Sequence, residues 1–132
     1  MKRARFLTTE GPYLEAFFQV EGQVLCVMYE FSVDERGLPK QGDEIELEFT
    51  ASVLEDEAWE EIFAGNPEHK VGLEQIDGWR YTAYGQVISI APVQVNCGLL
   101  TVQDVVHTND SRIVGEYVRF TISRLGGCAH AI

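Results

Sequence analysis

The sequence predicts a mainly β protein, a small antiparallel β-barrel or sandwich with one short helix. Several runs alternate apolar and polar residues, as a strand does when one of its faces is buried and the other solvated. Turn signals rich in Gly, Pro and Asp separate these runs. One stretch between these runs has its apolar residues at helical spacing instead. Many short strands divided by turns are typical of sandwiches and small barrels.

The clearest strand is Glu44–Val53, in which apolar and polar residues alternate without exception. It leads directly into a segment with helical spacing, for which Ser52 and Glu55 have the form of a capping box. Gly65 then ends the helix. We predict a helix over 53–64, with Trp59 or Ile62 closing an open end of the barrel. Its apolar stripe is Leu54, Ala58, Trp59, Ile62 and Phe63.

The other elements follow from the same patterns. Residues 14–20 and 23–33 form an expected hairpin, and 34–39 form a polar loop. A second hairpin turns at Asp77-Gly78 between strands at 71–76 and 79–91. Near Gly85, the larger apolar residues change from the odd-numbered to the even-numbered positions of the strand. This change predicts a bulge there. Further strands are expected within 93–102 and over 118–123.

The predicted order is three strands, a helix and three further strands. This order resembles that of the OB-fold, and it rests on element order alone. We predict a single domain over residues 1–132, with loose ends at 1–10 and 126–132. The chain has no apolar run long enough to span a membrane and no apolar segment of signal-peptide length at its start. Three cysteines without regular spacing are typical of a reducing compartment, so we expect a cytoplasmic protein.

Acidic residues dominate the charge. The net charge is −11, which disfavours a nucleic-acid backbone as the ligand. Nine carboxylates lie between Asp43 and Glu61 without one Lys or Arg. They are either a solubilising surface or a docking surface for a basic protein, for example a toxin held by an inhibitor or immunity-type protein. The expected partner-binding residues are Glu44, Glu46, Glu48, Asp56, Glu57, Glu60 and Glu61.

A second hypothesis is a barrel that binds a small molecule or a single-stranded nucleic acid. OB-like barrels that bind single strands place aromatic residues in a positively charged groove. The aromatic residues are present here, although the total charge has the wrong sign. The candidate ligand-binding residues are Trp79, Arg80, Tyr81, Tyr84 and Arg119.

A third hypothesis is an enzyme that uses Asp104, His107 and Asp110, with the His as general base. The alternative is a surface loop whose Asp residues build turns. No nucleophile motif accompanies these residues, so the sequence favours a protein without catalytic activity. Cys97, Cys128 and the His residues lack the spacing of a zinc site, and we expect no metal or cofactor.

Overall fold

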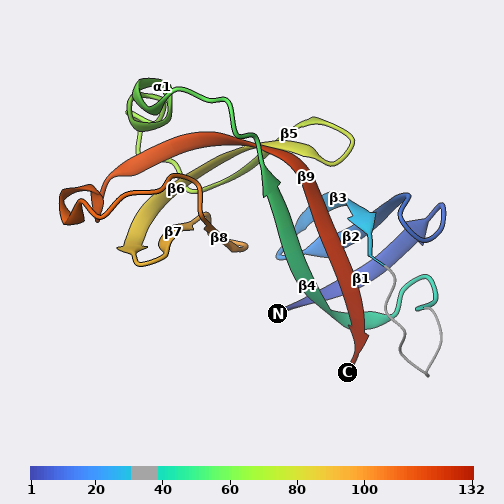
Figure 1. Ribbon diagram of the computed structural model, residues 1–132. Coiled ribbons are helices and arrows are strands. Elements are labelled where there is room, and N and C mark those ends of the chain that lie inside the picture. Colours follow the sequence, from blue (N-terminus) through green and yellow to red (C-terminus); the bar gives the residue numbers. More distant parts are fainter. Residues whose placement is uncertain (31–38) are drawn as a thin grey trace. The chain divides into compact units, whose positions relative to one another are not determined.

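The structure is a computed structural model that describes residues 1–30 and 39–132. The predicted strand end at 31–33 and most of the predicted loop at 34–39 lie outside the described residues. Among the described residues, no helix has the length and apolar character needed to cross a membrane. The strands are β1 (Lys2–Thr9), β2 (Glu15–Val20), β3 (Gln23–Tyr29), β4 (Glu44–Val53), β5 (Gly72–Asp77), β6 (Arg80–Ile90), β7 (Val93–Asn96), β8 (Thr101–Gln103) and β9 (Tyr117–Ala131). Helix α1 (Trp59–Ala64) follows β4, and a 3-10 turn, η1 (Ser111–Ile113), precedes β9 (Figure 1).

Five strands close into a barrel, as predicted. Their order is β3-β2-β1-β4-β9, and β3 returns to pair with β9 in parallel. The closing register places Met28 opposite Gly126 and Tyr29 opposite Gly127. In β9, a Cβ at Gly127 would meet the side chains of Val27 and Leu47. This position therefore has little room for a side chain.

Contacts divide the chain into two compact units, which we describe separately. The barrel unit comprises residues 1–52, 77–79 and 124–132. The helix unit comprises residues 53–76 and 80–123. The expectation of a single domain stays a prediction.

The expected loose ends are strands, which corrects the sequence prediction. Residues 2–9 form β1, and β9 continues to Ala131. β1 is short of apolar residues, but its alternation places Ala4 and Phe6 in the core with Arg3 and Arg5 outside. The Phe6 ring packs edge-on against that of Phe18, with 5.5 Å between centroids.

In the helix unit, β6 pairs with β5, β7 and β9. Its buried residues Tyr81 and Ala83 lie opposite Ile122 and Phe120 of β9, which are buried as well. The predicted bulge is displaced along β6. Gly85 keeps regular pairing with β9, and the register shift towards β7 falls between Val87 and Ser89.

Helix α1 is shorter than predicted, because it begins at Trp59. Ala58 occupies the N-cap position without a side-chain hydrogen bond, so the predicted capping box is absent. The preceding residues are tied to β9 instead: the Leu54 N–H donates to the Thr121 carbonyl, and the Glu57 carboxylate accepts the Thr121 N–H. Ile62 is buried, whereas Trp59 is 45% exposed and is no core plug.

Candidate functional site

The acidic residues of β4 have basic neighbours in the barrel unit. Arg5 and Arg3 of β1 lie opposite Glu44 and Glu46, and Arg5 Nη2 is 3.8 Å from Glu44 Oε1. The third carboxylate, Glu48, lies 3.0 Å from His130 Nε2. The basic N-terminus thus lies beside the acidic strand. Cross-strand pairs of opposite charge reduce the field that these carboxylates present to a partner.

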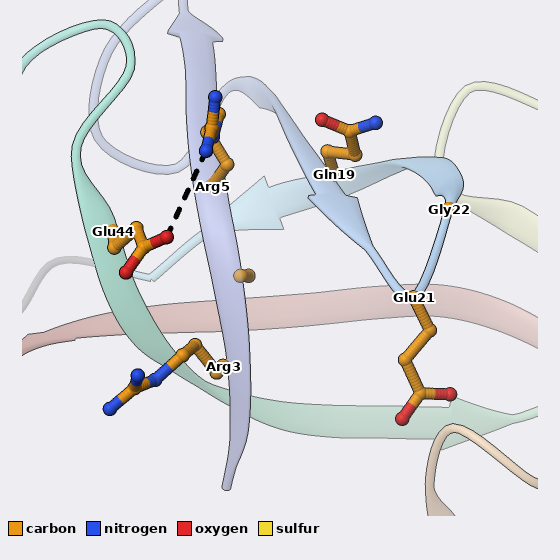
Figure 2. Close-up of a pocket in the computed structure, with 7 residues that line it drawn as sticks. Arg3, Arg5, Gln19, Glu21, Gly22 and Glu44 are labelled. Atoms are coloured by element: carbon orange, nitrogen blue, oxygen red, sulfur yellow. Dashed lines mark ion pairs between the residues drawn. The ribbon is translucent and has the colours of Figure 1, made fainter.

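A shallow polar groove of about 220 Å³ lies over these strands. Lys2, outside the groove lining, pairs with Glu21 at 3.1 Å. Figure 2 shows the guanidinium groups of Arg3 and Arg5 pointing in different directions, so they do not converge on one anion. The groove therefore offers scattered polar contacts and no reactive group. Its lining residues are Arg3, Ala4, Arg5, Gln19, Glu21, Gly22 and Glu44.

In the helix unit, the carboxylates around α1 are arranged differently. The Glu57 carboxylate also accepts the Thr121 hydroxyl, at 3.2 Å, so both oxygens of this half-buried side chain are engaged with β9. Asp56, Glu60 and Glu61 are exposed and form no ion pair within the part of the chain that the structure describes.

Two exposed apolar side chains belong to the same stretch of sequence as these carboxylates. Leu54 is 41% exposed, and the exposed Trp59 ring packs beside Phe63 with 5.6 Å between centroids. The sequence assigned both to the core, because helical spacing alone does not show which residues a shortened helix leaves outside. We name Leu54, Asp56, Trp59, Glu60 and Glu61 the α1 surface.

The structure brings two of the expected ligand-binding residues together and places another in the core. Tyr81 is 1% exposed and belongs to the core, so it is unable to contact a ligand. Tyr84 lies opposite Arg119 on the other face of β6, and Lys70 Nζ lies 5.0 Å from the centre of its ring. Arg80 is exposed, and Trp79, its neighbour in the sequence, is half-buried.

Asn66 holds the loop after α1 in place, near Tyr84 of β6. The buried Asn66 amide donates to the Lys70 carbonyl at 2.9 Å and to the Val118 carbonyl at 3.2 Å. Its oxygen accepts the Lys70 N–H at 2.8 Å. The chain's own loop therefore supplies the cation that contacts Tyr84.

The loop with Asp104, His107 and Asp110 is built as a turn. Arg112 donates to both oxygens of Asp110 at 2.7 to 3.1 Å, and these bonds lower the Asp110 pKa to about 2. The Asp110 carboxylate also accepts the Arg112 backbone N–H, at 3.0 Å, and thereby caps η1. Among the described residues, no hydrogen bond joins His107 to either carboxylate. A general base needs such a contact or a water between the groups, so this arrangement favours the turn-building role.

The two fully buried thiols are unsuited to reaction. Burial raises the pKa of Cys97 to about 12, and burial together with Glu15 and Glu10 raises that of Cys26 to about 11. Protonated thiols are weak nucleophiles and weak metal ligands. No group of three or more His, Cys, Asp or Glu side chains in the described residues is placed to hold a metal ion.

Comparison of the chain with protein-family models, curated proteins and solved structures found no match. A barrel by itself does not determine a function. The functional argument therefore rests on the surfaces described above.

Proposed function

We propose that this protein is a non-enzymatic binding protein that docks a basic protein partner through the α1 surface. An inhibitor or immunity-type protein that caps a basic toxin, such as a nuclease, is one concrete form. The observation that carries the proposal is the exposed Trp59, followed in the sequence of α1 by two exposed carboxylates that have no cationic partner among the described residues. We expect a smaller contribution to binding from the acidic residues of β4, because each has a basic residue beside it. These residues are Glu44, Glu46 and Glu48.

Two interactions act together at such a surface. Unpaired carboxylates attract a basic partner and accelerate its association, in a way that salt weakens. A Lys or Arg placed over the Trp59 ring would add about 0.5–2 kcal/mol through a cation–π contact. Trp residues are also common among the few side chains that carry most of the binding energy at interfaces.

The test uses ¹⁵N-labelled protein and a synthetic peptide in which Arg and Leu alternate. We expect the Trp59 indole N–H signal, assigned with Trp59→Phe, to shift on titration, with weaker binding as salt rises from about 0.05 to about 0.2 M. Glu60→Gln/Glu61→Gln should weaken binding more than Asp104→Asn/Glu116→Gln. The control pair removes the same charge from exposed sites elsewhere in the helix unit. If both pairs weakened binding equally, the binding would depend only on the total charge of the protein, and the proposal would be overturned.

A further inference from the structure

The turn that joins β1 to β2 can be followed in Figure 1. It carries a group of exposed apolar side chains. Tyr13 is 63% exposed and Leu14 is 49% exposed, and Pro12 beside them is exposed as well. We name residues Glu10–Leu14 the β1–β2 tip. All of it belongs to the barrel unit, whereas the residues of the α1 surface belong to the helix unit.

The backbone of the tip is held in place at several points. Tyr13 has a φ of 62°, a left-handed conformation that residues other than Gly seldom adopt. The Tyr13 N–H donates to the Tyr29 carbonyl at 2.7 Å, and the Tyr29 N–H donates to the Leu14 carbonyl at 2.8 Å. The Thr9 hydroxyl donates to the Glu15 carbonyl and accepts the Gly11 N–H, each at 3.1 Å. These bonds fix the position from which the Tyr13 side chain projects.

The charge around the tip is negative. Glu10 and Glu15 bracket the apolar residues, and neither forms an ion pair among the residues of known position. Their field reaches the interior of the barrel unit, where it adds to the effect of burial on the pKa of Cys26. An approaching surface would therefore meet an apolar projection between two unneutralised carboxylates.

We infer that the β1–β2 tip is a second docking site, whose occupant is a protein surface with an apolar pocket for Tyr13 and Lys or Arg at its rim. Tyr is among the residues that dominate binding energies, and a projection already fixed in place loses little conformational entropy on binding. A second copy of this chain fits poorly, because a symmetric contact at the tip would bring Glu10 and Glu15 against like charges. This inference goes beyond the proposed function and does not depend on it.

The test selects displayed random peptides on the wild-type protein after depletion on Tyr13→Asn. Asn tolerates the left-handed conformation, so this variant removes the ring and leaves the turn intact. We expect the selected peptides to contain Lys or Arg next to apolar residues. They should bind Tyr13→Asn about tenfold more weakly or worse, and Glu10→Gln/Glu15→Gln more weakly at low salt.

The matched control is Val24→Ala, which shortens an apolar side chain that is 58% exposed on β3 of the same unit. It should bind the selected peptides as the wild type does. Peptides without cations, or a loss of binding in Val24→Ala equal to that in Tyr13→Asn, would overturn the inference. So would a dimer in sedimentation equilibrium that Tyr13→Asn dissociates, because the occupant would then be a second copy.

Discussion

Arg5 of β1 lies directly opposite Glu44 of β4, with 3.8 Å between Nη2 and Oε1. Strand β1 thus places a positive charge beside β4, a strand whose own charged residues are all acidic. Both side chains are about half exposed, so the pair contributes modestly to stability.

Arg5→Glu should lower the free energy of unfolding by about 0.2–1 kcal/mol, because like charges would then face each other across the strands. Urea unfolding at low and high salt measures the effect, which should shrink as salt screens the repulsion. Arg124→Glu makes the same charge change at an exposed site of the barrel unit and is the control. An equal loss in both variants would mean that total charge, and not the pairing with Glu44, sets the cost.

Glu57→Ala should lower the free energy of unfolding by about 1–3 kcal/mol. The change removes the acceptor of the Thr121 N–H, and Thr121 is buried in the structure. Glu55→Ala, at an exposed site two residues away, should stay within about 0.5 kcal/mol of the wild type. Similar values for both variants in denaturant unfolding would show that Glu57 is only a surface charge.

Ile62→Ala should cost about 2–5 kcal/mol, the range for a large aliphatic side chain in a core. Ile62 is 4% exposed, whereas its neighbours Glu60 and Glu61 are exposed. Changing either Glu to Gln should leave stability within about 0.5 kcal/mol. Denaturant midpoints of the three variants decide the matter, and a mild Ile62→Ala would place α1 outside the core of the helix unit.

Gly85→Ala should destabilise the protein by about 1–3 kcal/mol, as overpacking does. A Cβ on Gly85 would meet the backbone carbonyl of Asn96 and, at 2.7 Å, a methyl group of Val95. Because the carbonyl belongs to the paired strand β7, it has little freedom to move. Combining the change with Val95→Ala should recover only part of the loss in thermal unfolding, and full recovery would mean that the Val95 methyl alone causes the clash.

The stability of the protein should fall as the pH rises above about 9, in part through Cys97. Its pKa is about 12 in the fold against an ordinary value of 9.0, so the unfolded chain loses this proton first. The contribution is complete below pH 9 and is lost as the pH rises towards 12, at up to about 1.4 kcal/mol per pH unit. In urea unfolding, Cys97→Ala should lose less stability than the wild type over this range. Parallel curves for the two proteins would contradict the raised pKa.

The sequence by itself determined the class of fold and most of its strands. Glu44–Val53 has the same bounds in the structure as in the prediction, because strict alternation depends only on one face being buried. A turn after the strand at 71–76, and a long strand after that turn, were also predicted from local signals, although the turn lies at Gly78-Trp79, one residue later than predicted. Where the local pattern is weak, as in β1 with its three basic residues, a strand forms because β2 and β4 pair with it on both sides.

Only the tertiary structure decided which residues of the expected surfaces are accessible. In the sequence, Glu57 looks like one more exposed carboxylate. In the structure its carboxylate accepts a hydrogen bond from the backbone N–H of Thr121, which is far away in the sequence. Trp59 reads as a core residue, yet the segment before it is tied to β9, so the helix starts late and leaves the ring exposed. Exposure and pairing depend on contacts between distant segments, and a single sequence does not contain those distances. The exposed Tyr13 was missed for the same reason, since its left-handed backbone is set by Tyr29 on another strand.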